Sequence, residues 1–222
     1  MEKIKIRKLT KSKIYLYATL FLLSIITIYT LITMDFGNVN IAEAADHFFK
    51  DLKTMFFSPK LSDRYTYSQV FQSLMVTIAL AALTTIIGSF IALFLSFFAA
   101  QNLSSKYVSK IIKLGITFFR AIPTILWVMV FSVVANVGVE AAIIGMTFHS
   151  VAYLVKAYSE SIEEIDNGII EALRATGASF WKVIFQAVLP STSTSLLSWT
   201  FIRFEINFTN AVLVGAAAGA GG

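Results

Sequence analysis

The chain has 222 residues, of which 57% are hydrophobic and only 14% are charged. Soluble domains carry about 25% charged residues, so this composition excludes an ordinary soluble domain and indicates one polytopic membrane domain. The complete lack of cysteine excludes disulfide bonds and thiolate metal sites. The formal net charge of +5 does not indicate a nucleic-acid partner, because much of it lies in one short N-terminal block.

That block precedes the first apolar stretch, residues 14–34. A signal peptide has an apolar core of about 7–15 residues followed by a small-residue cleavage site. This stretch is longer, and residues 34–37 make a poor cleavage site. We therefore expect a retained transmembrane helix whose N-terminus is cytoplasmic, by the positive-inside rule. The basic residues of the block are Lys3, Lys5, Arg7, Lys8, Lys11 and Lys13.

Further apolar stretches cover residues 70–100, 114–137, 141–158 and 188–204. A helix needs about 20 apolar residues to cross the hydrocarbon core of a bilayer. Because backbone groups in lipid must be hydrogen-bonded internally, these spans should be helices. The predicted fold class is therefore an all-α polytopic membrane bundle with about five transmembrane helices. Within the second stretch, Gly88 indicates close helix packing.

The loops between these stretches predict the topology. Residues 102–113 carry lysines and no acid, so we expect them on the cytoplasmic side. Residues 35–69 mix acids with bases and should be external. Within this external loop, two pairs of aromatic residues fit equally well a short amphipathic helix on the membrane surface or a loop packed on the bundle: Phe48, Phe49, Phe56 and Phe57.

Residues 159–187 should lie on the cytoplasmic side and form two short helices with a break between them. Asp166 or Asn167 can cap the first helix. Gly177 is placed for a left-handed residue at its end, and Ser179 can cap the second. On local pattern alone, an ordinary amphipathic connector between two spans explains the segment equally well.

The same segment contains Glu-Ala-x-x-x-x-Gly and, after nine further residues, x-x-Leu-Pro. This pattern resembles the coupling motif of the permeases of binding-protein-dependent ABC importers. The resemblance implies a type I importer permease bundle whose short helix docks into a cytoplasmic ATPase. Leu173 and Ala187 depart mildly from the commonest pattern. The matching positions are Glu171, Ala172, Gly177, Leu189 and Pro190.

Three other runs resemble the phosphonate branch of these permeases, which includes phosphite and phosphate-like importers. They are residues 120–124 (Arg-Ala-Ile-Pro-Thr), 149–150 (His-Ser) and 203–207 (Arg-Phe-Glu-Ile-Asn). The resemblance divides the chain into residues 1–66, an N-terminal transmembrane helix with an external loop, and residues 67–222, the permease core. Relatives of this branch continue past the glycine-rich end into a further transmembrane helix, so we expect that helix to be missing here.

The resemblance implies a permease subunit of an ATP-driven importer of phosphonate or a related phosphorus oxyanion, in the bacterial cytoplasmic membrane. Its partners would be the lipid bilayer, a cytoplasmic ABC ATPase dimer, a second permease subunit, identical or paralogous, and an extracytoplasmic substrate-binding protein. The chain lacks the Gly-x-x-x-x-Gly-Lys-[Ser/Thr] phosphate loop. We therefore expect no enzyme and no cofactor in this chain, with ATP hydrolysed on a separate polypeptide.

Charged residues in the last stretch are candidates for the substrate pathway. Arg203 lies roughly 20 Å beyond Pro190 along a helix, in the outer part of the bilayer. Intramembrane charges face a cavity or pair with one another. One hypothesis is that Arg203 attracts the oxyanion, with Asn207 as a neutral donor. The alternatives are a structural pair of Arg203 with Glu205 or with another subunit, or an arginine that snorkels to the interface.

His149 lies in a mostly apolar span. A buried, hydrogen-bonded histidine explains it better than a role in the substrate pathway. The other histidine, His47, lies far away in the external loop, so the sequence predicts no metal site.

Other classes of membrane protein explain the sequence less well. A membrane-embedded enzyme would need convergent catalytic groups, and the chain lacks His-Glu-x-x-His, Gly-x-Ser-x-Gly and an Asp pair within the spans. A secondary transporter or channel that is not driven by ATP remains the alternative, although such proteins typically show repeats or broken helices at the midplane.

Overall fold

The computed structural model describes residues 10–34, 40–59 and 65–218, and every regular element in these ranges is a helix. The chain divides into two compact units, Met1–Lys60 and Leu61–Gly222, each described here by itself. Most of the basic N-terminal block and the last glycines lie outside the described residues.

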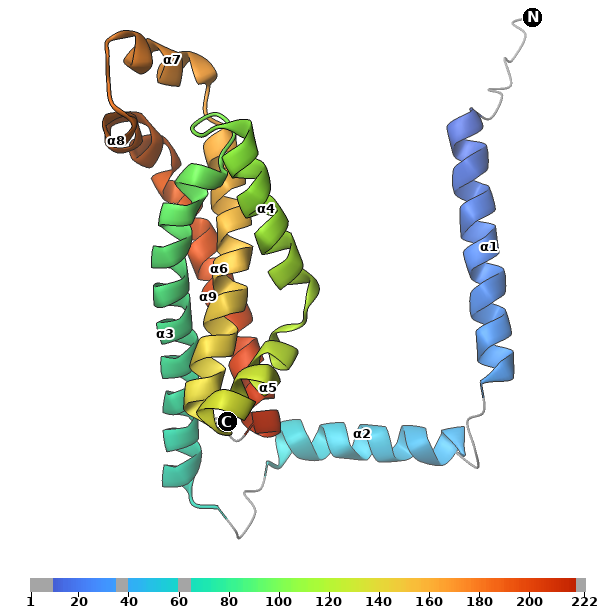
Figure 1. The fold of residues 1–222 in the computed structure, drawn as a ribbon. Helices are drawn as coiled ribbons and strands as arrows, with labels where there is room; N and C mark the ends of the chain where they lie inside the picture. Colours follow the sequence, from blue (N-terminus) through green and yellow to red (C-terminus); the bar gives the residue numbers. More distant parts are fainter. Residues whose placement is uncertain (1–9, 35–39, 60–64, 219–222) are drawn as a thin grey trace, which may run out of the picture. The chain divides into compact units, whose positions relative to one another are not determined.

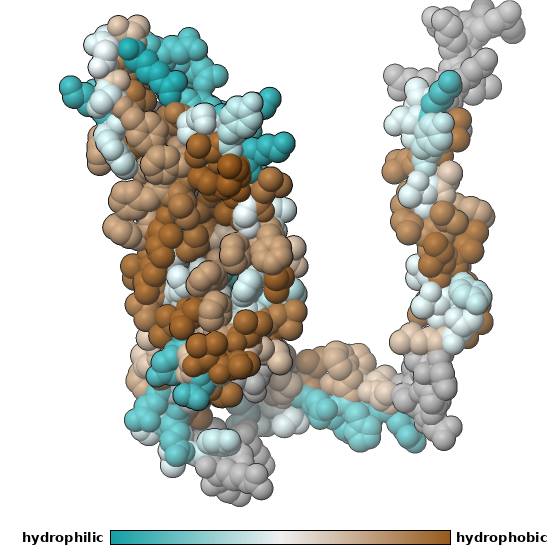
Figure 2. Space-filling model, viewed as in Figure 1, coloured by the Kyte–Doolittle hydropathy of each residue, from teal (hydrophilic) through white to brown (hydrophobic). Residues whose placement is uncertain are grey.

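The first unit contains two helices, α1 (Lys11–Thr33) and α2 (Ile41–Phe57). Helix α1 forms where the first transmembrane helix is expected. Helix α2 begins where the side chain of Asn40 accepts a hydrogen bond from the Ala42 amide at 3.1 Å. Figure 2 shows apolar side chains along one side of α2 and polar ones along the other. The loop predicted to be external therefore contains an amphipathic helix, and both its side of the membrane and its position on the membrane surface stay predictions.

The second unit is a bundle in which α3 (Tyr67–Ala99), α6 (Val139–Glu163) and α9 (Leu189–Ala218) pack side by side (Figure 1). Thr66 and Gln69 form a reciprocal capping box that begins α3. Helix α3 begins three residues before the second predicted span and ends one residue before its end, and α6 exceeds the fourth predicted span at both ends. The bundle agrees with a multi-pass helical membrane protein.

The third predicted span, residues 114–137, is sharply bent at Pro123. Helix α4 (Lys106–Ala121) and helix α5 (Thr124–Ala135) meet at an angle of 88°. Pro123 causes the break, because its ring lacks an N–H and forces the preceding Ile122 into extended backbone at φ −95° and ψ 125°. The indole N–H of Trp127 then donates to the Phe119 carbonyl at 3.1 Å across the bend.

The last span also differs from its prediction of residues 188–204. A short helix α8 (Phe180–Val183) runs into a five-residue π-helical turn, η1 (Ile184–Val188), and then into α9. The Leu189 amide donates to the Ile184 carbonyl, five residues back. Pro190 has no N–H to donate and crowds the preceding turn, and the wider π turn accommodates it. Helix α9 then continues to Ala218.

Within the described ranges, the helices long and apolar enough to cross a membrane are α1, α3 and α6. The bent pair α4 and α5 is a fourth candidate if its two arms form one broken span. Helix α9 has 30 residues, enough to cross a bilayer by length, but hydroxyl residues fill its first turns and make it less apolar.

Two glycines allow the helices to approach closely. A Cβ at Gly88 would lie 2.8 Å from the Ser150 Cβ, which confirms close packing between α3 and α6. A Cβ at Gly145 would lie 2.6 Å from the backbone nitrogen of Val128, so α6 touches the backbone of α5. Backbone cannot yield as a flexible side chain can, so Gly145 fixes the position of the short arm α5.

We predict that Gly145→Ala lowers the stability of the solubilised protein by about 1–3 kcal/mol, because the added methyl group forces α5 away from α6. Gly115→Ala is the matched control, because a Cβ there would meet nothing within 4 Å. Thermal unfolding in detergent measures both variants. Equal unfolding temperatures for the two would contradict the close contact between α5 and α6.

Candidate coupling segment and buried polar network

The short helix α7 (Asn167–Ala175) is held by a cap at each end. The Asp166 side chain accepts from the Gly168 amide at 2.9 Å. At the other end Gly177 adopts φ +81°, and the Ala178 amide donates to the Leu173 carbonyl at 3.2 Å. The bond from Ala178 to Leu173, together with the positive φ of Gly177, is typical of a Schellman motif and confirms the predicted helix end at Gly177.

The second predicted cap is only half right. Ser179 stands at the N-cap position of α8, but its side chain makes no capping hydrogen bond. On α7, Ile170 is 1% exposed whereas Ile169 is 46% exposed. Ile170 packs in a cluster with Leu103 and Val183, and Leu173 packs against this cluster, so α7 lies against the end of the bundle through these two residues.

The structure separates the residues of the coupling motif into two places. Glu171 and Ala172 lie exposed on α7, and Gly177 forms the turn that ends it. Leu189 and Pro190 instead begin α9, after α8 and η1, where Leu189 packs against the core. A Cβ at Gly177 would meet nothing within 4 Å, so glycine is needed there for its positive φ and not for space.

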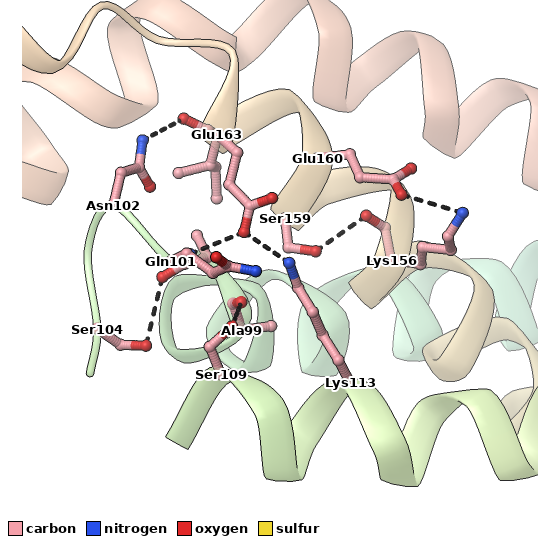
Figure 3. Close-up of polar contacts among 12 residues, drawn as sticks. Ala99, Gln101, Asn102, Ser104, Ser109, Lys113, Lys156, Ser159, Glu160 and Glu163 are labelled. Carbon is pink, nitrogen blue, oxygen red and sulfur yellow. Dashed lines mark hydrogen bonds and ion pairs between the residues drawn. The ribbon is translucent and has the colours of Figure 1, made fainter. Parts of the chain in front are cut away.

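A polar cluster beside α7 was not found by sequence reasoning (Figure 3). Glu163, at the end of α6, accepts from the Lys113 ammonium and from the Gln101 amide, each at 2.7 Å. The Asn102 side chain donates to the Ile162 carbonyl at 2.8 Å. From the sequence, Lys113 could be used only to predict the cytoplasmic side of its loop, because its partner Glu163 lies 50 residues away in the chain.

A second polar network lies inside the bundle. The Asn207 amide is fully buried and donates to the hydroxyls of Thr85 and Ser150, each at 2.9 Å, and of Thr84 at 3.3 Å. Arg203 is 1% exposed and donates through Nε to Ser150 at 3.1 Å. The network therefore joins α3, α6 and α9.

Arg203 has no acidic partner among the recorded ion pairs of the described residues. Its Nη2 is buried without a hydrogen-bond partner, and its guanidinium lies 5.2 Å from the ring centre of Tyr153. The Arg120 guanidinium lies 5.9 Å from the same ring. Glu205 is exposed, so neither the pair with Glu205 within the chain nor the snorkelling arginine is what the structure contains.

His149 is half-buried on α6, and the backbone of Ile122 and of Phe119 lies within reach of its ring. Its Nδ1 is buried without a hydrogen-bond partner. Arg120 and Arg203 are its charged neighbours. Across the described ranges, no three His, Cys, Asp or Glu side chains come close enough to hold a metal ion.

We predict that Asn207→Ala destabilises the bundle by about 1–3 kcal/mol, because three buried hydroxyl groups lose a donor. Thr209→Ala, an exposed position on the same helix, should change stability by less than about 0.5 kcal/mol. The unfolding midpoints of both variants in detergent check this, and an Asn207→Ala protein as stable as the control would show that the network contributes nothing.

Comparisons with known proteins place these features in a family. The chain is 28% identical over 197 residues to the phosphate-import permease protein PhnE of Mycolicibacterium smegmatis, covering 88% of this chain and 36% of that protein. It is 29% identical over 167 residues to the putative phosphite transport system permease protein HtxC of Stutzerimonas stutzeri, covering 75% and 58%. The chain thus spans less than two thirds of the length of these relatives.

The fold matches solved structures as well. An inward-facing MetNI methionine ABC transporter chain aligns with a TM-score of 0.65 at 21% identity, over 73% of this chain and 79% of that one. In sequence, residues 92–222 match the family described as the inner membrane component of binding-protein-dependent transport systems. Because this match covers more than half of the chain, the chain belongs to the family of binding-protein-dependent transport system inner membrane components.

Proposed function

We propose that the chain is the permease subunit of an ATP-driven importer for phosphonate or a related phosphorus oxyanion. The observation that carries this proposal is α7, a short helix capped at both ends that leaves Glu171 and Ala172 exposed. Family membership supports a transport role, and the names of the relatives, phosphate-import and phosphite permeases, support the substrate class.

Helix α7 suits a docking role because it is presented in a fixed orientation. Its two caps and the buried Ile170 hold it against the bundle, so little conformational freedom is lost on binding. Alanine and glycine leave a low surface around Glu171 on which the ATPase can close. Closure of a separate ATPase dimer would then move two such permeases between inward-facing and outward-facing states as rigid bodies.

The proposed orientation places α7 and the N-terminus in the cytoplasm. Figure 1 shows the first turns of α4 at the same end of the second unit as α7. Those turns carry Lys106, Lys110 and Lys113, and lysines gather on the cytoplasmic side. The opposite end of this unit would face the substrate-binding protein.

Arg203 supplies the proposed attraction for the oxyanion. A buried cation without an acid beside it is costly in lipid and attracts an anion. Its unpartnered Nη2 and the nearby Arg120 leave donor capacity free for an anion. The side-chain amide of Asn207 lies within hydrogen-bond distance of three hydroxyls and holds together the helices around Arg203. Glu205 is exposed and lies outside this buried network.

The first test of this proposal concerns Glu171. We predict that Glu171→Ala lowers co-purification of the ATPase about tenfold, because an exposed carboxylate at the centre of an interface is lost. ATP-driven uptake of phosphonate into vesicles should fall in parallel. Glu140→Ala is the control, since Glu140 lies in the first turn of α6, at the end opposite α7.

Uptake that continues without ATP would contradict the proposal of ATP-driven import and favour a secondary transporter or channel. Full ATPase binding by the Glu171→Ala protein would leave the importer intact but remove α7 as its docking site.

The second test concerns Arg203. We predict that Arg203→Gln raises the KM for oxyanion uptake about 10- to 100-fold, the loss of one charge-assisted interaction. Arg203→Lys should lie between, because a lysine keeps the charge but loses the planar donor fork. Membrane abundance measured by immunoblot separates a folding defect from a transport defect. Unchanged uptake by Arg203→Glu at normal abundance would remove Arg203 from the pathway.

A further inference from the structure

The turn between α3 and α4, residues 100–105, lies next to α7 and exposes backbone carbonyls toward it. Its own bonds are few: the amides of Leu103 and Ser104 donate to the Ala100 carbonyl at 3.3 and 3.1 Å. The carbonyls of Asn102 and Leu103 are therefore available to accept hydrogen bonds from another element.

Arg174 of α7 provides that partner. Its Nη2 donates to the Asn102 carbonyl and to the Leu103 carbonyl, each at 3.1 Å. These bonds join residues more than 70 positions apart in the chain. A guanidinium that donates to carbonyls makes charge-assisted bonds, and its place just after the end of α3 is favourable for a cation.

Apolar packing supports the same contact. Leu103 from the turn and Ile170 from α7 are buried in one cluster, 7% and 1% exposed. The hydrogen bonds of Arg174 thus lie beside the buried apolar contact between Leu103 and Ile170. The turn and α7 touch both through side chains and through hydrogen bonds.

The other side of the turn is fastened to α6 and α4. Glu163 accepts from the Gln101 amide and from Lys113, and Asn102 donates to the Ile162 carbonyl (Figure 3). The turn is therefore held from α4, α6 and α7 at once. Among these groups only Arg174 comes from the proposed coupling helix.

We infer that Arg174 is a positioning residue that fastens α7 to the α3–α4 turn, so that the two move as one body and movement of α7 reaches α3 directly. This inference rests on the proposed function. Without the clamp, α7 would act on the bundle through its two chain connections, to α6 and to α8, and through the apolar packing of Ile170, which makes no directional bond. With it, α7 acts on α3, the longest helix in the bundle.

The inference separates ATPase binding from force transmission. Arg174→Ala should leave co-purification of the ATPase within about twofold of wild type, because Glu171 remains exposed. Uptake per ATP hydrolysed should fall about fivefold or more, the effect of losing an interaction of this kind. Lys110→Ala, which removes an exposed cation from α4, should change neither quantity. An unchanged ratio of uptake to hydrolysis in Arg174→Ala would overturn the inference.

A rescue experiment exploits the absence of native cysteine. Gln101→Cys with Arg174→Cys removes the clamp, and a flexible bismaleimide then replaces it by a covalent link. We expect the linked protein to regain uptake per ATP that the unlinked double variant has lost. A link that forms but restores nothing would show that the turn and α7 must separate during transport.

Hydrogen exchange on the full chain alone tests the clamp without transport. Arg174→Ala should speed exchange in both the turn and α7, relative to Lys110→Ala. Faster exchange in α7 alone would disprove the clamp itself. A wild-type chain with a coupled turn but no ATP-dependent uptake would instead disprove the proposed function, so the two failures are distinguishable.

Discussion

Close backbone approach is the constraint on which the bundle depends. Lipid tails are as apolar as the side chains of these helices, so burying leucine against leucine gains little inside a membrane. Contacts that lipid cannot imitate must hold the helices together. Gly88 and Gly145 bring backbones within reach of one another, and the hydrogen bonds of Asn207 join α3, α6 and α9. Both kinds of contact fail if the helices separate by even an ångström or two.

The same constraint explains why the unit can pass a movement from one end to the other. Helices locked at glycines and at a shared polar network shift as a group and do not deform one by one. For the docking role proposed for α7, a stiff attachment to this group of helices is then enough to transmit its movement. The cluster around Glu163 and the α3–α4 turn provides stiffness at that end, whereas Arg203 and Asn207 lie well along α9.

Local signals in the sequence predicted local structure well. Asp166 and Gly177 were identified as the two ends of α7 because capping depends on the chemistry of one residue and its immediate neighbours. The 88° bend at Pro123 could not be predicted from the sequence, because it is fixed by Trp127 and by the contact of Val128 with Gly145. The π turn before Pro190 gave no sequence signal.

Features that depend on distant residues were missed or left open. The pairing of Lys113 with Glu163 and the contacts of Arg174 join residues 50 or more positions apart, beyond the reach of any local pattern. For Arg203 the sequence left its pairing undecided, and only the packed bundle shows it against Tyr153. Of the neighbours Ile169 and Ile170, only Ile170 is buried, and helical spacing alone cannot tell which of two adjacent apolar residues meets the bundle.

The π turn at Ile184–Val188 determines how α8 is rotated about the helix axis relative to α9. A π turn holds one residue more than an α-helical turn, which rotates everything before it by about 100° relative to an unbroken α-helix. The aromatic rings of Phe180 and Trp181 therefore face the end of α3, where they pack on Phe98 and Phe97. Deleting one residue from this turn would rotate both rings away from α3, although the sequence of every α-helix would be unchanged.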